Sequence, residues 1–482
     1  MTKFKVCSRT LVIVLLTASS AFADGAVAQM TGGVHEKNLQ PDNMELHLTG
    51  VKQSEDTVDI VGSDGVVGQN GDIGMEERDY VFLFGNVHRD TAVLRVLVQN
   101  APDYFNAPDM PRFAIVGKER KFYLGIGGFV KASVSYDLGD PIENPLGFVT
   151  SAIPMDNLPG NSSLVQMSAG ASNLFFNFIA LPHTKNQIGA YVNFAFSGNG
   201  ANYGFSLKSA YFTYKGFSLG YKTSLFTDGA ASAPTVDQQG PNAMTFVFNT
   251  VLNYQYAFNS HWKVGLGLEL PMVDATYNAT TYGVNQRIPD IPFYVQYSWA
   301  DGEAWLRLSG LIRNMYYRDK ATSATVDEVG YGIKLSSATP LRHNLKLFSQ
   351  CVYGKGIGSY IQDLQGLGLD MVPVSENGRL EGVTSWASYV GLQWKISPKF
   401  SSAIIYSMVE SYLPKNSANA VEQNEFMPST TYKNAKYVVS NLFYNITPSV
   451  QAGVEYLWGS RENIDGISRH DTRLQTAVRV NF

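Results

Sequence analysis

Lysines and arginines recur along this chain in phase with polar neighbours, and apolar residues occupy the alternate positions. In the last segment Arg473 and Arg479 alternate with Leu474, Val478 and Val480. If such cations lined the wall of a water-filled channel, they would concentrate anions there and lower the energy barrier to anion entry. A ring of acids would favour cations instead. The predicted set of inward cations is Lys131, Lys208, Lys222, Arg307, Arg313, Lys334, Lys346, Arg461, Arg473 and Arg479. Few acids share that phase, and the two clear ones are Glu269 and Glu455.

The segment that ends the chain indicates which element positions these cations. Leu474, Thr476, Val478, Val480 and Phe482 fall on one side at a period of two, and polar residues fall on the other. A strand of this kind that closes on an aromatic residue is typical of the last strand of a bacterial outer-membrane β-barrel. Phe482 would then be the C-terminal signal read by the barrel-assembly machinery. The alternative is the edge strand of a soluble sheet.

Counting alternating segments favours the barrel. About sixteen segments follow residue 120, and they lie at 121–136, 171–181, 187–197, 203–214, 217–226, 244–258, 261–270, 291–299, 303–316, 327–337, 343–353, 385–396, 400–410, 433–445, 449–460 and 471–482. Links after the even segments are short turns, and links after the odd ones are mostly long. Barrels in an outer membrane have this asymmetry, with short periplasmic turns and long loops opposite. We therefore predict an all-β transmembrane antiparallel barrel of about 16 strands, the size that leaves an aqueous channel.

The N-terminus predicts export. Lys3, Lys5 and Arg9 precede a short apolar run, and Ala21-Phe22-Ala23 offers a small-x-small cleavage site. This is a secretory signal peptide, too short for a transmembrane helix. The predicted organisation is a signal peptide at 1–23, a small periplasmic extension at 24–118 and the barrel at 119–482. A loosely ordered leader and a plug inside the lumen are the alternatives for the extension.

The link after the fifth strand is a candidate constriction. Residues 227–243 are rich in small residues and are stiffened by two prolines, so the loop can fold inward and narrow the channel. Its candidate residues are Asp228, Pro234, Thr235, Asp237, Gly240 and Pro241. The alternative is an ordinary extracellular loop.

Other functional classes find little support in the residues. The net charge of −4 argues against a nucleic-acid partner, and Cys351 is left without a disulfide partner once the signal peptide is removed. The seven histidines show no metal-ligand spacing, and no nucleophile, base and orienting group stand out. We expect no catalysis, no metal and no cofactor. A structural or adhesive barrel with a closed lumen stays open as an alternative.

Five short motifs in order resemble the DcaP-like trimeric outer-membrane porins, relatives of the phosphate-selective porins. The stretch 127–137 is similar to the family's first-strand motif Gly-x-Val-Lys-x-x-x-x-Tyr-Asp, and 234–241 is similar to its third-loop pattern Pro-x-Thr-x-Asp…Gly-Pro. The segments 289–291, 354–360 and 453–463 resemble three further family motifs, with Ser359 where arginine is common. The family's N-terminal coiled coil has no counterpart, because residues 29–118 lack heptads.

This resemblance covers residues 121–482 and implies a sixteen-stranded homotrimer with an inward third loop. Together with the strand pattern it leads us to expect a porin in the outer membrane of a Gram-negative bacterium. The expected partners are outer-membrane lipid and small hydrophilic solutes, with a preference for anions.

Overall fold

A computed structural model describes residues 113–155, 162–197, 203–375, 379–415 and 426–482, with short pieces at 60–61, 80–83, 96–97, 101, 103–104, 107–108 and 111. The predicted signal peptide and most of the predicted extension lie outside the described residues. Among the described residues, no helix is long and apolar enough to cross a membrane.

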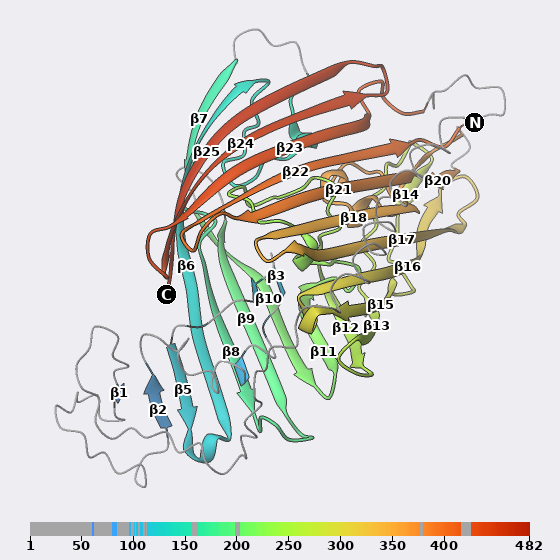
Figure 1. Cartoon of the computed structure of the whole chain (residues 1–482). Coiled ribbons are helices and arrows are strands. Elements are labelled where there is room, and N and C mark those ends of the chain that lie inside the picture. The colour runs from blue at the N-terminus through green and yellow to red at the C-terminus, as the bar shows by residue number, and fades with distance from the viewer. Residues whose placement is uncertain are drawn as a thin grey trace. The chain divides into compact units, whose positions relative to one another are not determined.

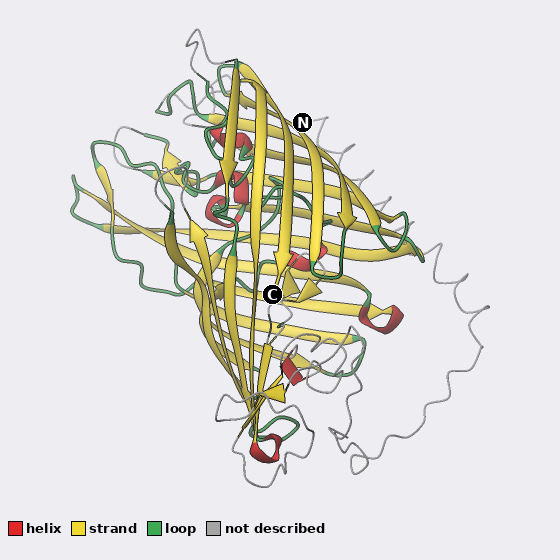
Figure 2. Cartoon of the chain, turned by 90° about the vertical axis from the view of Figure 1, so that its left-hand side faces the viewer, coloured by secondary structure: helices red, strands yellow, loops and turns green. Residues whose placement is uncertain are grey.

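Sixteen antiparallel strands form a closed ring, as predicted (Figures 1 and 2). Each strand pairs with the next, and β25 returns to pair with β6, with Arg479 directly opposite Lys131. The strands of the ring are β6 (Phe122–Gly139), β8 (Asn173–Ala180), β9 (Ile188–Ser197), β10 (Gly204–Tyr214), β11 (Phe217–Thr223), β12 (Phe248–Ala257), β13 (Trp262–Glu269), β15 (Ile291–Trp299), β16 (Ala304–Asp319), β17 (Thr325–Arg342), β18 (Leu345–Lys355), β21 (Thr384–Lys395), β22 (Phe400–Tyr412), β23 (Tyr432–Asn445), β24 (Val450–Asn463) and β25 (Ser468–Asn481).

The two faces of the ring follow the alternation in the sequence. On β25 the outward Leu474 is 55% exposed, whereas the inward Arg473 is fully covered. On β6 Val130, Val134 and Tyr136 are likewise exposed. An exposed apolar outer face on a closed sheet without edges satisfies the two demands of a lipid bilayer, which are apolar contact and paired backbone groups. The ring is therefore an outer-membrane type of barrel.

The connections also segregate by length. The turn between β10 and β11 is Lys215-Gly216, and both residues have a positive φ, which suits the twist of a tight hairpin. At the other end the long links carry extra elements that the sequence reading placed in loops: β7 (Ser163–Ser168), β14 (Thr281–Gly283), β19 (Met371–Pro373) and β20 (Leu380–Gly382). The predicted strands 217–226 and 244–258 were too long, because residues 224–247 leave the wall and turn inward.

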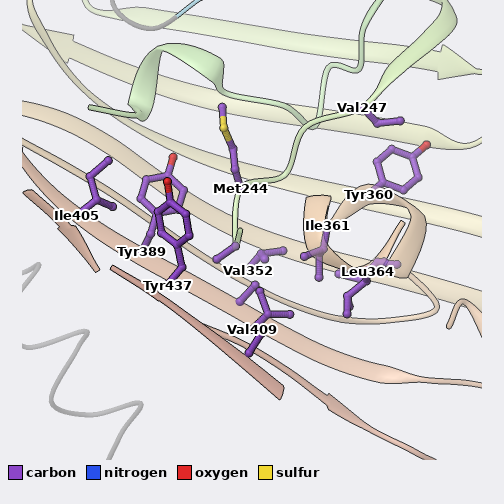
Figure 3. Packing of buried hydrophobic residues seen from close by; sticks show 14 of the residues in the cluster. Met244, Val247, Val352, Tyr360, Ile361, Leu364, Tyr389, Ile405, Val409 and Tyr437 are labelled. Carbon is purple, nitrogen blue, oxygen red and sulfur yellow. The ribbon is translucent and has the colours of Figure 1, made fainter. Parts of the chain in front are cut away.

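Three of the long loops fill much of the lumen. They are loop 1, whose residues 140–155 turn inward, loop 3 (224–247) and loop 6, described at 356–375 and 379–383. They carry the 3-10 helices η5 (Thr150–Ala152), η6 (Gly229–Ala231), η8 (Gly358–Tyr360) and η9 (Gln362–Leu364). Their apolar side chains, such as Met244, Ile361 and Leu364, pack against inward residues of the wall such as Val352 and Val409 (Figure 3). The main hydrophobic core thus lies inside the barrel.

Below the ring, the strand β5 (Phe113–Gly117) pairs with the edge of β6 just beyond the C-terminus. Phe482 and Gly128 exchange two backbone hydrogen bonds, and Phe113 then stands opposite Ile126. The sheet continues through β2 (Tyr80–Leu83) to β1 (Ile60–Val61), while β3 (Asp103–Tyr104) pairs with β4 (Ala107–Pro108). Two further 3-10 helices among the described residues are η4 (Lys118–Arg120) and η7 (Ala300–Gly302). The part of the predicted extension that is described therefore begins as a continuation of the barrel sheet.

Candidate functional site: the lumen and its inward loops

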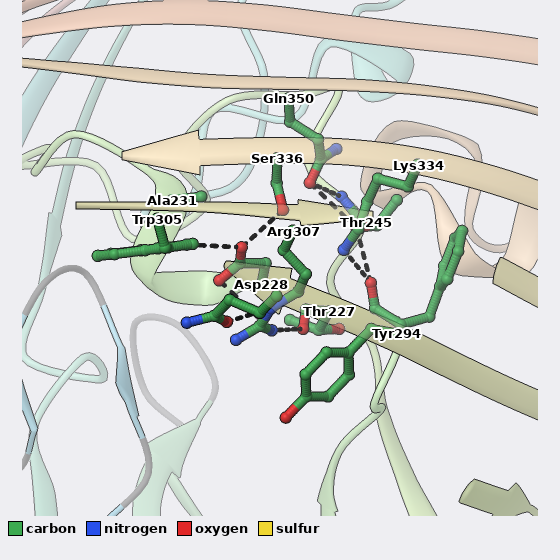
Figure 4. A network of polar contacts seen from close by, with 12 residues as sticks. Thr227, Asp228, Ala231, Thr245, Tyr294, Trp305, Arg307, Lys334, Ser336 and Gln350 are labelled. Atoms are coloured by element: carbon green, nitrogen blue, oxygen red, sulfur yellow. Dashed lines mark hydrogen bonds and ion pairs between the residues drawn. The ribbon is translucent and has the colours of Figure 1, made fainter. Parts of the chain in front are cut away.

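Loop 3 enters the lumen at Asp228, which is fixed to strands β16 and β17 of the wall (Figure 4). Its carboxylate accepts hydrogen bonds from Ser336 Oγ at 2.6 Å and Trp305 Nε1 at 3.1 Å, and it lies 3.5 Å from a guanidinium nitrogen of Arg307. Burial alone would raise the pKa of Asp228, but the cations of Arg307 and Lys334 and these hydrogen bonds lower it below its usual value. Asp228 is thus an ionised anchor at neutral pH.

The tip of loop 3 is held by β24 and β6. The Glu455 carboxylate accepts hydrogen bonds from the backbone N–H groups of Val236 and Asp237 at 2.7 and 2.6 Å. Lys131 Nζ donates to the carbonyl oxygen of Val236 at 2.5 Å. Asp237 is buried, which raises the pKa of its carboxyl despite the nearby cations of Arg473 and Lys131. The inward course of the third loop is therefore confirmed.

The other predicted residues of loop 3 shape its tip. Thr235 Oγ1 donates to the carbonyl oxygen of Asp237, and Gly240 N donates to the Asp237 carboxylate. Gly240 has a φ of 72°, a conformation that favours glycine. Pro234 lines a cavity described below, and Pro241 is buried.

Loops 1 and 6 meet loop 3 around another buried carboxylate, Asp363. It accepts hydrogen bonds from Thr150 Oγ1 at 2.7 Å, Ser151 N at 2.9 Å and Tyr432 Oη at 2.7 Å. Burial raises the pKa of Asp363, and these hydrogen bonds partly oppose that effect. Thr150 also accepts a hydrogen bond from Asn242 of loop 3 at 2.8 Å. The three loops are therefore connected by one polar network, which we did not foresee because its members lie in separate loops.

Two cavities remain open beside these loops. The lower one, toward the short turns, has a volume of about 1260 Å³ and is lined by residues of β10, β11, β15 and β16 together with the root of loop 3. The upper one, of about 490 Å³, is lined by loops 1, 3 and 6 and by Lys208 and Tyr221. Residues of β10 and β11 line both cavities, so a route past loop 3 would follow these two strands.

Every predicted cation lies on an inward or mouth position, but only four line these cavities. Lys222, Arg307 and Lys346 line the lower cavity, and Lys208 lines the upper one. Lys222 Nζ lies 4.4 Å from the ring centroid of Tyr211, and Arg307 stacks on Tyr294 at 4.5 Å. Arg461 and Arg479 lie at opposite ends of the barrel: Arg461 donates to the carbonyl oxygen of Thr430 beside the long loops, and Arg479 lies over the ring of Phe129 at 3.8 Å near the short turns.

Three predicted pore-lining cations are instead covered by the inward loops, which corrects their assignment to the open channel. Arg313 is fully buried between Asp290 and Asp370, each 3.1 Å away. Lys334 donates to the carbonyl oxygen of Phe226 and to Thr245 Oγ1. The guanidinium of Arg473 forms a two-point ion pair with Asp137, a lumen acid that the sequence reading missed. In each case a loop or neighbouring strand supplies the partner that neutralises or covers the cation.

The two predicted lumen acids are also covered. Glu269 accepts a hydrogen bond from Leu225 N at 2.7 Å and lies beneath Tyr360 of loop 6. Glu455, as described above, is engaged by loop 3. Both carboxylates therefore act as attachment points for loops within the described lumen.

Part of the N-terminal segment also lies at the lower side of the lumen. Leu97 packs on the inward Tyr123 and Ile179, and its carbonyl oxygen accepts a hydrogen bond from Asn177 Nδ2 at 2.5 Å. Ala101 lines the lower cavity, and β3 lies against η6 of loop 3. Of the described N-terminal residues, Ala101 therefore contributes to the wall of the lower cavity.

Comparison with solved structures assigns this arrangement to a known class of fold. The outer membrane channel DcaP of Acinetobacter baumannii aligns with a TM-score of 0.64 and 18% identity over 76% of this chain and 99% of that chain. An anion-selective porin from Comamonas acidovorans aligns with a TM-score of 0.46 and 12% identity over 75% of this chain and all of that chain. No family model and no curated protein matches the sequence. The chain has the fold of an outer-membrane channel such as DcaP.

Proposed function

We propose that this chain is an outer-membrane porin, a water-filled channel through which small hydrophilic solutes diffuse passively, with a preference for anions. The fold supports the proposal of a channel, and the charge of the lower cavity supports the preference for anions. Eight cations line the lower cavity: Lys185, Lys215, Lys222, Lys263, Arg307, Arg342, Lys346 and Lys395. Only three acids line it, namely Asp228, Asp301 and Glu303, which leaves a formal excess of five positive charges. Such an excess raises the local concentration of anions.

The upper cavity supports the same preference. Lys208 is the one charged residue among those lining it. An anion that passes loop 3 along β10 and β11 would therefore meet Lys208 and then Lys222. We also propose that the porin is a homotrimer in the outer membrane, which rests on the family resemblance, and that Phe482 is read during assembly.

Ion selectivity in a planar bilayer tests the proposal. In a salt gradient, the reversal potential of the purified protein should have the sign of anion permeation. Lys222→Glu should lower the anion-to-cation permeability ratio by about two- to fourfold, because it changes the local charge by two units at a distance comparable to the screening length. Lys436→Glu, which reverses an exposed lysine on the outer face of β23, is the matched control and should leave the ratio unchanged. A reversal potential of the opposite sign would overturn the anion preference.

The packed lumen favours one alternative, a barrel that does not conduct. Loops 1, 3 and 6 share a hydrophobic core with the wall, and this leaves little free cross-section beside them. Single-channel recording separates the two functions, because a structural or adhesive barrel would insert into the bilayer without discrete conductance steps.

A further inference from the structure

The outer wall carries a cluster of cations and tyrosines directly above its lipid-facing band. Strands β16 and β17 have 16 and 18 residues, more than the roughly 9–11 that cross a bilayer, so both project beyond it. Ile312 and Val329 are 50% and 56% exposed on the outer face and mark the lipid-facing band. Asn314 stands opposite Val329, so Arg318 lies four residues further along β16. That distance is about 13 Å along the strand and about 9 Å in height for a strand tilted by 45°.

Strand pairing brings the members of this cluster together. Arg318 stands between Tyr282 of β14 on one side and Thr325 of β17 on the other. Arg287 Nη2 donates to Thr325 Oγ1 at 3.4 Å, and its guanidinium lies 5.4 Å from the ring of Tyr316. Lys320 Nζ lies 5.9 Å from the ring of Tyr282. We call this set the outer rim patch: Arg287, Arg318, Lys320, Tyr282 and Tyr316.

The charges of the outer rim patch are not neutralised within the described part of the chain. No carboxylate there lies within 4.0 Å of its three cations, although the same wall pairs Lys355 with Glu328 at 2.7 Å on the inner side. Asp327 is the nearest acid by register, opposite Tyr316, and it leaves a formal excess of two positive charges. Arg287 and Lys320 are exposed. A patch of three cations at this height can bind an anionic partner from the membrane surface.

We propose that the outer rim patch binds the phosphate groups of a lipid in the outer leaflet. Two arginines offer planar pairs of N–H donors that suit phosphate oxygens, and Lys320 adds a point charge. The tyrosine rings lie at the boundary between apolar tails and polar headgroups, where amphipathic rings are favourable. The exposed Ile312 and Val329 below would contact the acyl chains of the same lipid. The partner is thus an amphiphile with phosphate at its head.

Binding of a phosphorylated glycolipid tests this site. We would measure the affinity of the detergent-solubilised full chain for fluorescent diphosphoryl lipid A and for the same lipid without phosphates. The wild type should bind the phosphorylated lipid more tightly. The variant Arg287→Ala/Arg318→Ala/Lys320→Ala should lose at least about tenfold in that affinity, because each cation contributes a charged hydrogen bond. Arg318→Gln alone should show a smaller loss and covers the case in which the triple variant fails to fold.

The control replaces two exposed lysines at the short-turn end that line neither cavity: Lys121→Ala/Lys399→Ala. It should retain the affinity for diphosphoryl lipid A. Two results would overturn the site: equal binding of the phosphorylated and dephosphorylated lipids, or an unchanged affinity in the folded triple and single variants. If inorganic phosphate alone, at equal molar concentration, displaced the labelled lipid, the patch would be a site for free phosphate, and the proposal of a lipid site would be wrong.

Discussion

Asp228 shows how a single carboxylate can hold a loop in place at a defined range of pH. Its pKa is lowered in the folded chain, so its contribution to stability is complete above the unfolded value near 4 and is lost as the pH falls through the folded value. At neutral pH Asp228→Asn removes the attraction to Arg307 and turns an N–H group toward existing donors. We expect the variant to be less stable by about 2–3 kcal/mol.

Urea unfolding of the barrel at pH 7 and pH 3 measures this effect. The difference between wild type and Asp228→Asn should be largest at pH 7 and should shrink at pH 3, because the unfolded chain then binds a proton at Asp228 that the folded chain holds less tightly. Asp327→Asn, an exposed acid on the outer face, is the control and should change little at either pH. An equal difference at both pH values would show that ionisation of Asp228 does not stabilise the fold.

Lys222 and Lys334 show that the sequence can predict whether a side chain points into the barrel, but not whether a loop covers it there. Both lie in the polar phase of their strands, so a period of two is enough to place them inside. Lys334 is covered because loop 3 brings the carbonyl oxygen of Phe226 to it from more than a hundred residues away. Strand alternation carries no information about such long-range contacts. Asp137 was missed for a related reason, since it lies one residue beyond the first predicted segment, 121–136, and its partner Arg473 comes from the last strand.

At the scale of elements, loop 3 is fixed to the barrel wall at two points, near its start through Asp228 and at its tip through Glu455. The prolines and small residues at 227–243 predicted the inward fold, whereas the participation of loops 1 and 6 came from partners such as Asp363 that no local pattern indicates. The tip depends on Glu455, whose two carboxylate oxygens each accept a backbone N–H of the loop. An amide at this position has one acceptor only and would present a donor to the second N–H.

We therefore expect Glu455→Gln to loosen the tip of loop 3 while the barrel stays closed. The loss of one charged hydrogen bond, worth about 1.5–3 kcal/mol, should speed hydrogen exchange at Val236 and Asp237 by about tenfold or more. Hydrogen-exchange mass spectrometry of peptides from 224–247 is the measurement. Glu410→Gln alters a carboxylate on the outward side of β22, bonded to Trp386, and should leave those peptides unchanged. Unaltered exchange in Glu455→Gln would mean that the tip is held by other contacts.

At the scale of the whole molecule, the ring has one joint that no hairpin makes, where β25 meets β6. Eleven residue pairs form this joint, from Asp471 opposite Gly139 to Asn481 opposite Phe129. Within it, Arg473 and Asp137 face each other on the inner side, fully covered, and Arg473 also donates to the carbonyl oxygens of Ile142 and Asn144 in loop 1. The pair therefore connects the first strand, the last strand and a loop, although Asp137 and Arg473 lie 336 residues apart in the sequence.

Removing only one partner of this ion pair should destabilise the closed barrel more than replacing both partners with apolar residues. Arg473→Ala leaves a buried carboxylate without its cation and should cost about 3–5 kcal/mol, whereas Arg473→Met/Asp137→Leu replaces the pair with apolar groups of similar size and should recover much of that loss. Heat-modifiable migration on SDS gels reports closure: the folded band of Arg473→Ala should convert to the unfolded band at a lower temperature than wild type, with the double variant between them. If Arg473→Ala and wild type convert at the same temperature, the pair does not hold the joint, and the backbone ladder between β25 and β6 is sufficient to close the ring.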